Sequence, residues 1–184
     1  VNSAMVESLN GGKSHIDDLS DADIAEMISL GFTASPDEAV LSEAAAIVIC
    51  VPTPLSIDGE PDLGAVIGAT TTISRQLGKG QLVVLESTTY PGTTDEVVRP
   101  ILEKGGLVAG TDFHLAFSPE RVDPGNPTYG IANTPKVVGG HTPACTDVAV
   151  AFYGRFIETV VPSKGTREAE MTKLLEDTYR HINI

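Results

Sequence analysis

Three segments of this sequence place polar side chains directly after runs of apolar residues. They are Pro52-Thr53-Pro54, Ser87-Thr88-Thr89 and Ser118-Pro119-Glu120. Hydroxyls and backbone amides can bind a ligand, and a carboxylate can also move a proton. If the apolar runs are parallel strands, these segments meet at one edge of a sheet, where ligands bind in open α/β proteins. The spacing therefore predicts a ligand site built from three strand ends.

The third segment belongs to the stretch His114–Asn126, which has a simpler alternative interpretation. Two prolines and a glycine interrupt it, so we expect a shaped loop after a strand. Polar loops are common on protein surfaces, and in such a loop Glu120 and Arg121 would be solvated. Composition alone leaves both interpretations open, and the two neighbouring strand ends favour the ligand site.

Lys173 and Asp177 form a second candidate, on a helix predicted from Thr166 to the C-terminus. They are four residues apart and therefore share a helix face, with Glu170 nearby. The pattern alone favours a surface ion pair worth about 0–1 kcal/mol.

The cysteines and histidines show no catalytic or metal-binding spacing. Cys50 lies in a β-branched run and is expected to be a buried apolar side chain. Cys145 lies in a predicted first helical turn, which could lower the pKa of its thiol, but no local base supports a nucleophile. The four histidines are expected to be solvated or bonded locally.

Alternating strands and helices must position these residues. Strands are predicted at Ile47–Val51, Leu82–Leu85, Leu115–Phe117, Pro135–Gly139 and Thr159–Val161, and the first two are expected to be buried. Helices are predicted up to Asn10, from an N-cap at Ser20, from Pro36, over Leu63–Leu77, after Thr93, over Thr142–Phe156 and from Thr166. Thr93 and Glu96 have the spacing of a capping box, and Ile67 belongs to the stripe of its helix that is expected to be buried. The last helix has one apolar face, formed by Met171, Leu174, Leu175, Thr178 and Ile182. Strand and helix at this spacing predict an α/β fold with a doubly wound, mostly parallel sheet.

Composition limits the partners. The chain has 184 residues and a net charge of −13, which argues against nucleic acid. No apolar run is long enough to cross a bilayer, so no membrane partner is expected. Two cysteines without ligand spacing suggest a reducing compartment, and we expect a cytoplasmic protein. The dinucleotide fingerprint G-x-G-x-x-G is absent, and Gly11-Gly12 does not follow a strand.

Four motifs together resemble the UDP-sugar 6-dehydrogenases, in order and with family-like spacing along the whole chain. They are Val48-Ile49-Cys50-Val51-Pro52-Thr53-Pro54, Glu86-Ser87-Thr88-Thr89-Tyr90-Pro91-Gly92-Thr93, Phe117-Ser118-Pro119-Glu120-Arg121-Val122 and Glu170-Met171-Thr172-Lys173-Leu174-Leu175-Glu176. The form Glu120-Arg121-Val122-Asp123-Pro124-Gly125-Asn126 resembles the branch that acts on UDP-N-acetylmannosamine or UDP-N-acetylglucosamine more than the UDP-glucose branch.

The resemblance implies a two-step, NAD-dependent oxidation of a sugar C6 alcohol to a carboxylate in a homodimeric enzyme. In that family a cysteine traps the intermediate aldehyde, and a second hydride transfer gives a thioester that water hydrolyses. Thr53, Thr88 and Pro124 would contact NAD. Residues 1–165 would form a Rossmann-like NAD-binding domain with an incomplete first βαβ unit, and residues 166–184 would begin the long central helix.

The resemblance also assigns the catalytic and substrate residues. Glu120 would act as acid/base in thioester hydrolysis, and Lys173 would stabilise the oxyanion at C6. Asp177 stands where the family usually has asparagine, and a carboxylate there would oppose an oxyanion. The residues expected to bind substrate are Glu120, Arg121, Val122, Asp123, Pro124 and Lys173.

Two other family features have no match in this sequence. Neither Cys50 nor Cys145 matches the catalytic cysteine, and the glycine-rich loop has no counterpart, so we expect this chain alone to be inactive. A non-catalytic binding or assembly module on the same scaffold, or a related hydroxyacid or phosphogluconate dehydrogenase, are the alternatives. An unpaired sheet edge and apolar surface around Val6, Leu9 and Val48 would favour self-association.

Overall fold

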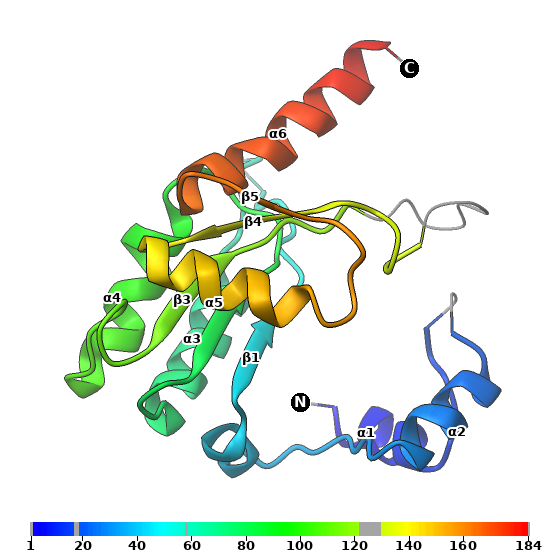
Figure 1. Cartoon of the computed structure of the whole chain (residues 1–184). Helices are drawn as coiled ribbons and strands as arrows, with labels where there is room; N and C mark the ends of the chain where they lie inside the picture. Colours follow the sequence, from blue (N-terminus) through cyan, green and yellow to red (C-terminus); the bar gives the residue numbers. More distant parts are fainter. Residues whose placement is uncertain (1, 17–18, 58, 122–129, 184) are drawn as a thin grey trace. The chain divides into compact units, whose positions relative to one another are not determined.

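The computed structural model describes residues 2–16, 19–57, 59–121 and 130–183, which form two compact units, Val1–Val40 and Leu41–Ile184. In the first unit, helices α1 (Ser3–Asn10) and α2 (Asp21–Ser29) lie where the sequence predicts helices (Figure 1). Ser20 and Asp23 form a capping box at the start of α2, because each side chain accepts a hydrogen bond from the other's backbone amide. The predicted cap is confirmed. The short helix predicted from Pro36 is a 3₁₀ helix, η1 (Glu38–Glu43).

The second unit contains a five-stranded sheet whose spatial order follows the sequence, β1-β2-β3-β4-β5. The strands are β1 (Ala46–Ile49), β2 (Leu82–Leu85), β3 (His114–Phe117), β4 (Lys136–Gly140) and β5 (Val160–Pro162). β1, β2 and β3 are parallel, β4 is antiparallel to β3, and β5 is parallel to β4. The predicted α/β class with a mostly parallel, Rossmann-like sheet is confirmed.

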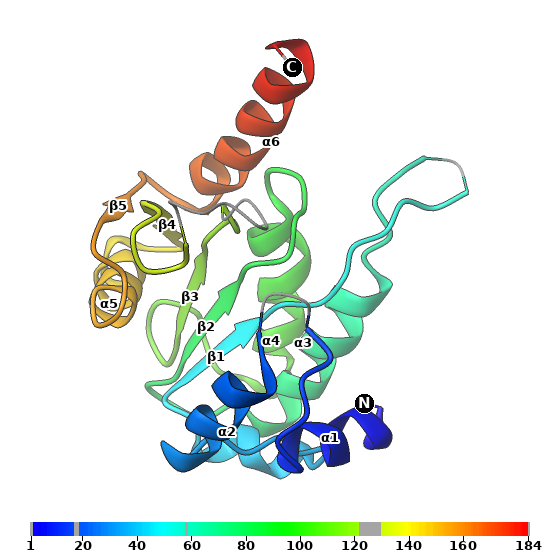
Figure 2. The ribbon, with the colours of Figure 1, turned by 90° about the vertical axis from the view of Figure 1, so that its right-hand side faces the viewer.

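Helices cover both faces of this sheet (Figures 1 and 2). The helical elements are α3 (Gly64–Gln76), the π-helix η2 (Thr94–Val98), α4 (Arg99–Leu102), η3 (Glu103–Gly105), α5 (Pro143–Tyr153) and α6 (Thr166–Asn183). Residues of α3, η2, α4 and α6 pack with one face, and residues of α5 pack with the other. Alternate strand residues face the two cores, as strand geometry requires: Val83 and Leu85 lie in one, Leu82 and Val84 in the other.

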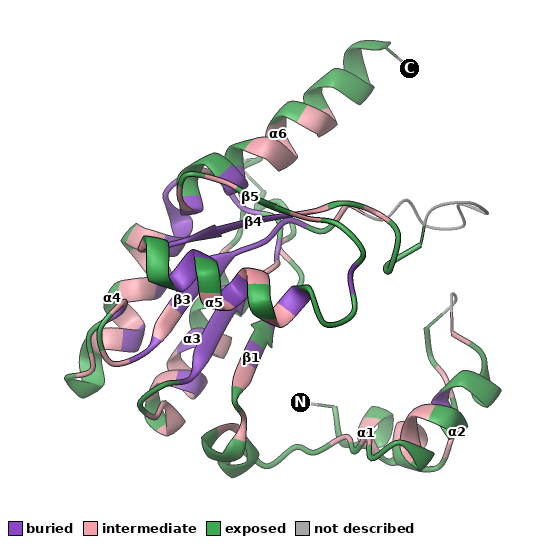
Figure 3. Ribbon diagram, viewed as in Figure 1, coloured by how far each residue is buried: buried purple, intermediate pink, exposed green. Residues whose placement is uncertain are grey.

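Two helices differ from the expected pattern. In α3 the stripe predicted to be buried includes Ile67, which is 42% exposed, whereas Thr70 is buried. Thr70 is tolerated inside because its hydroxyl donates to the carbonyl of Val66. On α6 the expected apolar face is open to solvent among the described residues, with Leu175 58% and Ile182 77% exposed (Figure 3).

The sheet edge at β1 bears on the expected self-association. β1 pairs only with β2 among the described strands, and Val48 on it is 37% exposed. An unpaired strand edge can template pairing with another chain. Self-association stays a prediction.

Close packing fixes where β4 meets the rest of the second unit. A Cβ added to Gly140 would lie 2.2 Å from the amide nitrogen of Thr146 in α5, and one added to Gly139 would lie 2.0 Å from the carbonyl oxygen of Gly165. Only glycine allows both approaches. The second approach holds the residues just before α6 against the sheet.

Candidate functional site

The three strand ends meet at a single cavity of about 290 Å³, as the sequence predicts. Its lining comprises Cys50, Val51, Pro52, Thr53, Glu86, Ser87, Thr88 and Glu120. β1, β2 and β3 are parallel, so their carboxyl ends open on the same edge of the sheet. Thr53, Thr88 and Glu120 are thus brought together from segments far apart in sequence.

Hydroxyl groups hold these strand ends in place. The Thr53 hydroxyl donates to the carbonyl of Thr88 over 2.7 Å, and the Ser87 hydroxyl accepts from the amide of Val51 over 2.9 Å. Ser118, which is fully buried, donates to the carbonyl of Val137 over 2.8 Å. Ser87 and Ser118 therefore tie the backbone of the site together, and the partly exposed Thr53 and the exposed Thr88 border the cavity.

A largely buried ion pair that sequence reasoning missed lies at the cavity, because Glu86 is one of its lining residues. The Lys136 ammonium is 3.0 Å from Glu86, and the two side chains are only 11% and 14% exposed. The Tyr153 hydroxyl also donates to Glu86, and the Lys136 ammonium lies 5.1 Å from the centre of the Tyr153 ring. Burial and the Glu86 carboxylate raise the pKa of Tyr153, so this phenol stays protonated.

The antiparallel direction of β4 explains why Lys136 was missed. Phe117 on β3 pairs with Gly139 on β4, so the first residue of β4 lies at the edge where β1, β2 and β3 end. A sequence pattern cannot distinguish this direction from the parallel one. The sequence does show a lysine, Lys136, at the start of an apolar run. Its partner Glu86 is 50 residues away, so no local pattern relates the two.

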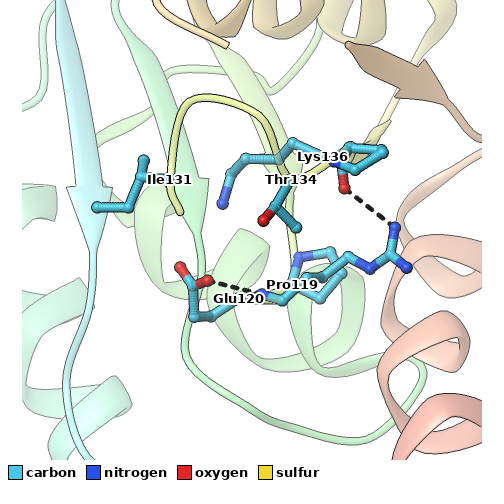
Figure 4. Close-up of a pocket in the computed structure, with 7 residues that line it drawn as sticks. Pro119, Glu120, Ile131, Thr134 and Lys136 are labelled. Carbon is cyan, nitrogen blue, oxygen red and sulfur yellow. Dashed lines mark hydrogen bonds between the residues drawn. The ribbon is translucent and has the colours of Figure 1, made fainter. Parts of the chain in front are cut away.

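Glu120 also lines a second, smaller cavity of about 20 Å³ (Figure 4). The other residues around it are Pro119, Arg121, Ile131, Thr134, Pro135 and Lys136. Glu120 itself is exposed, and its carboxylate accepts a hydrogen bond from the amide of Arg121 over 2.7 Å. Glu120 is therefore shared between the two cavities.

Arg121 is not the solvated side chain of a surface turn. Its guanidinium forms a two-point contact with Glu176 of α6, including a 3.0 Å bond from Nε, and donates to the carbonyl of Pro135 over 3.0 Å. A planar guanidinium is suited to such paired bonds. Arg121 therefore links the loop of Glu120 to the helix that carries Lys173.

The start of α6 is held by η2. Glu170, which is fully buried, accepts hydrogen bonds from the amides of Gly92 and Thr94 and from the Thr94 hydroxyl. Burial raises the pKa of Glu170, while these hydrogen bonds act in the opposite direction. The capping box predicted from Thr93 and Glu96 is wrong, because the Thr93 hydroxyl donates to the carbonyl of Tyr90. Glu170 binds the backbone amide of Thr94 instead.

Lys173 and Asp177 lie on α6 as an i,i+4 ion pair. Their charged atoms are 3.6 Å apart, and the side chains are 23% and 44% exposed. Neither residue lines the two cavities around Glu120 as far as the described residues form them. Val122, Asp123 and Pro124, three further predicted site residues, lie outside the described residues.

Neither cysteine has the environment of a nucleophile. The expectation that Cys50 is buried is wrong, because the chain leaves β1 at Ile49 and the residue is exposed beside the cavity. Desolvation of its thiol and the nearby Glu86 raise the pKa of Cys50 to about 11, so the thiolate is scarce at neutral pH. Cys145 is fully buried and accepts a hydrogen bond from the Thr142 hydroxyl over 3.2 Å.

The expectation that the histidines are solvated or bonded locally is wrong for two of them, since the buried Nδ1 of His114 has no hydrogen-bond partner among the described residues. His141 contacts Asp95, 46 residues away, over 2.7 Å. Within the described residues no group of three or more histidine, cysteine or acidic residues could hold a metal ion. The same part of the chain contains no helix with the length and hydropathy of a membrane span.

The chemistry of the larger cavity fits one end of a dinucleotide. Hydroxyls border it at the carboxyl ends of two parallel strands, where α/β proteins place such ligands. Beside it, the Thr89 hydroxyl is buried and has no hydrogen-bond partner among the described residues. Gly11-Gly12 follows helix α1 and not a strand, so it is not a phosphate-binding loop.

Comparison with known proteins supports this chemistry. Residues 1–157 match the NAD-binding domain of the UDP-glucose/GDP-mannose dehydrogenase family. The chain is 34% identical over its full length to UDP-N-acetyl-D-mannosamine dehydrogenase of Pyrococcus horikoshii, and 32% identical to UDP-N-acetyl-D-glucosamine 6-dehydrogenase of Pseudomonas aeruginosa. It covers 44% of each.

The fold agrees with the sequence comparison. The solved structure of the Pyrococcus horikoshii UDP-D-ManNAc dehydrogenase superposes with a TM-score of 0.93 at 34% identity, over all of this chain and 44% of that one. The chain thus spans less than half the length of the relatives it matches. It belongs to the UDP-glucose/GDP-mannose dehydrogenase family and corresponds to the NAD-binding part of these enzymes.

Proposed function

We propose that this chain is the NAD-binding part of an enzyme that oxidises the C6 hydroxyl of a UDP-N-acetylhexosamine to a carboxylate. The observation that carries the proposal is the convergence of Thr53, Thr88 and Glu120 on one cavity at the carboxyl ends of parallel strands. Relatives named for UDP-N-acetyl-D-mannosamine and UDP-N-acetyl-D-glucosamine support this substrate class.

The side chains around the larger cavity have distinct proposed roles. Thr53 and Thr88, with Pro124, contact NAD, which supplies a hydride acceptor for each oxidation step. Glu120 acts as acid/base in hydrolysis of the thioester that ends the reaction. It is exposed at the cavity and can therefore reach a substrate.

The proposed substrate residues are those of the loop after β3 and of α6. Arg121 holds α6 through Glu176, so its main effect is to fix the distance between Glu120 and Lys173. Lys173 stabilises the negative charge that develops at C6, since a preorganised cation can do so strongly in a dry site. Asp177, 3.6 Å from Lys173, orients the ammonium and partly offsets its positive potential. Val122, Asp123 and Pro124 line the sugar.

The proposal extends to organisation. Residues 1–165 form the NAD-binding part and residues 166–184 begin the central helix, which contributes to a homodimer in the cytoplasm. The exposed apolar side chains of α6, such as Leu175 and Ile182, supply surface for that contact.

A protein that contains this chain and extends to the full length of its relatives provides the test. NADH production is measured with UDP-N-acetylmannosamine, UDP-N-acetylglucosamine and UDP-glucose. We expect turnover with one of the N-acetylhexosamines. Turnover with UDP-glucose alone would assign the other branch, and turnover independent of uridine would indicate a hydroxyacid or phosphogluconate dehydrogenase.

Two variants refine this test. The chain alone is expected to produce no NADH, because the pKa of the Cys50 thiol is raised and Cys145 is buried. In the longer protein, Glu120→Gln should slow thioester hydrolysis by about 10²–10⁴-fold, the usual contribution of a general acid or base. Unchanged hydrolysis would contradict the role of Glu120.

A non-catalytic binding module is the second candidate. The ion pair between Lys173 and Asp177 favours it, because a carboxylate beside the lysine opposes an oxyanion. If the longer protein binds NAD and UDP-sugar but makes no NADH, and Asp177→Asn restores turnover, this second function is correct.

A further inference from the structure

We propose that Glu86 determines which dinucleotide this site accepts, because its carboxylate oxygen Oε2 accepts a hydrogen bond from the carboxamide group of the nicotinamide ring. The inference rests on the proposed function, which supplies NAD as the ligand. It goes further in two respects. It assigns the nicotinamide end of NAD to the larger cavity, and it assigns the selection of that end to a residue outside the expected site residues.

The two oxygens of the Glu86 carboxylate differ in their surroundings. Oε1 accepts a hydrogen bond from the Tyr153 hydroxyl and lies 3.0 Å from the Lys136 ammonium. Oε2 lies 3.8 Å from the sulfur of Cys50 and has no other hydrogen-bond partner in the part of the chain that the structure describes. Cys50 lines the larger cavity, whereas Tyr153 and Lys136 are not among its described lining residues. The carboxylate is therefore held through Oε1, which leaves Oε2 on the side of the cavity.

Oε2 can accept a stronger hydrogen bond than the one it has. A thiol is a weak donor, so the contact with Cys50 leaves most of the capacity of this oxygen unused. The Glu86 side chain is only 14% exposed, so water reaches it poorly. Hydrogen bonds to a charged acceptor are stronger than those between neutral groups. The cavity therefore favours a ligand that brings an N–H or O–H donor to Oε2.

The charges around the larger cavity disfavour the phosphates of a dinucleotide. Its described lining residues include two carboxylates, Glu86 and Glu120, and no lysine or arginine. Phosphates bind to cations or to the free amides at the start of a helix. At the start of η2 the amides of Gly92 and Thr94 are already bound to Glu170. The nicotinamide ring of oxidised NAD is positively charged and its carboxamide donates hydrogen bonds, so this end of the molecule fits the two carboxylates.

The place of Glu120 favours the same end of NAD. In the proposed function a hydride passes from C6 of the sugar to the nicotinamide ring, so the ring and C6 must lie side by side. Glu120 acts at C6, and it lines the same cavity as Glu86. The volume of about 290 Å³ is close to the lower limit of the roughly 300–1,000 Å³ that is usual for small-molecule sites. One end of a dinucleotide fits this space better than the whole molecule.

The first test measures dinucleotide affinity by isothermal titration calorimetry with the longer protein. The probes are NAD and nicotinic acid adenine dinucleotide, in which a carboxylate replaces the carboxamide. The acid analogue has no N–H group for Oε2 and brings a negative charge toward Glu86. We therefore expect wild type to bind it at least about 10-fold more weakly than NAD. Equal affinity for the two dinucleotides would overturn the proposal.

The second test assigns this preference to Glu86. Glu86→Gln removes the negative charge and adds a donor, so the preference for NAD should fall to about 3-fold or less. Tyr153→Phe is the matched control, because it removes a donor to Oε1 and leaves Oε2 in place, so it should keep the wild-type preference. If Glu86→Gln does not fold, Glu86→Gln/Lys136→Met is measured instead, since it removes both charges of the pair.

A purely structural role of Glu86 predicts a different result. Loosened strand ends would weaken the binding of both dinucleotides by the same factor, so the preference for NAD would stay at its wild-type value in Glu86→Gln. That result would overturn the proposal. A higher KM for the UDP-sugar in Glu86→Gln, with the dinucleotide preference unchanged, would also overturn it, because Oε2 would then bind a sugar hydroxyl.

The outcomes distinguish this inference from the proposed function. A wild-type protein that binds no NAD contradicts both. A protein that oxidises a UDP-N-acetylhexosamine with NAD, and whose Glu86→Gln variant keeps the wild-type preference, contradicts only the role of Glu86.

Discussion

Two ion pairs in this protein have the same chemistry, a lysine with a carboxylate, and differ in their surroundings. Lys173 and Asp177 are four residues apart on α6, 23% and 44% exposed, with their charges 3.6 Å apart. Lys136 and Glu86 are 50 residues apart in sequence, 11% and 14% exposed, and 3.0 Å apart. The first pair can be predicted from the sequence, whereas the second cannot and lies at the candidate site, where Glu86 lines the larger cavity. Sequence proximity therefore identified only the more exposed of the two pairs.

The largest effect is expected from breaking the pair of Lys136 and Glu86. Lys136→Met leaves the largely buried Glu86 without its cation, and loss of one partner of a fully buried pair costs about 3–5 kcal/mol, which is the upper bound here. The free energy of unfolding is measured by urea denaturation. The double variant Lys136→Met/Glu86→Gln should recover much of the loss. Lys79→Met is the control, since Lys79 is 77% exposed in its pair with Asp112. A loss of stability below about 1 kcal/mol in Lys136→Met would show that the pair of Lys136 and Glu86 contributes no more than an exposed pair.

Glu170 can be compared with Glu86, because it is a buried carboxylate that accepts hydrogen bonds from amides and a hydroxyl instead of pairing with a lysine. Burial raises its pKa above the ordinary 4.5, so the folded protein binds this proton more tightly than the unfolded chain. The resulting stabilisation is complete below pH 4.5 and is lost as the pH rises through the folded-state pKa. The free energy of unfolding of wild type relative to Glu170→Gln should therefore fall with pH across that range.

Urea titrations at a series of pH values from about 4 to 8 check this dependence. Glu168→Gln is the control, because Glu168 lies on the same helix and is exposed. A difference between wild type and Glu170→Gln that grows with pH would mean that the hydrogen bonds from Gly92 and Thr94 outweigh burial.

An intermediate effect is expected at Arg121, whose pair with Glu176 is 25% and 33% exposed. Arg121→Lys replaces a planar group that makes paired bonds with a single ammonium, so about 1 kcal/mol of stability should be lost. In the longer protein, the same change should lower kcat more than it raises the KM for NAD, since it disturbs the spacing between Glu120 and Lys173. Arg155→Lys, at an exposed residue, is the control. A rise in the KM for the UDP-sugar, with kcat unchanged, would favour direct substrate binding by Arg121.

The smallest effect is expected at Asp177. Asp177→Asn removes a partly exposed i,i+4 pair, which should change the free energy of unfolding by about 0–1 kcal/mol. Thermal unfolding of wild type and variant measures this. A loss above about 2 kcal/mol would show that the pair of Lys173 and Asp177 stabilises the fold. The two lysine–carboxylate pairs would then differ less in their contribution to stability than their exposed fractions imply.

Much of the secondary structure and part of the site follow from local patterns. Short apolar runs predict all five strands to within a residue or two, because strands of a sheet covered on both faces carry near-continuous apolar residues. Ser20 and Thr142 cap α2 and α5 as their residue types predict. The convergence of Thr53, Thr88 and Glu120 also follows, given parallel strands.

The errors arise where a long-range contact overrides a local preference. Thr93 and Glu96 have the spacing of a capping box, yet Glu170 from α6 binds the amides there and η2 becomes a π-helix. Cys50 continues the apolar run that forms β1, but the strand ends at Ile49, one residue before it. Ile67 has the spacing of a core residue and lies on the open side of α3.

By itself, the sequence determined the α/β class, the caps of α2 and α5 and the three polar strand ends, because each depends on residues within a few positions of one another. Only the tertiary structure decided the direction of β4, and with it the meeting of Lys136 with Glu86 and the cavity shared by Glu120 and Thr134. Strand direction depends on how the whole chain packs to bury both faces of the sheet, and no local pattern encodes it.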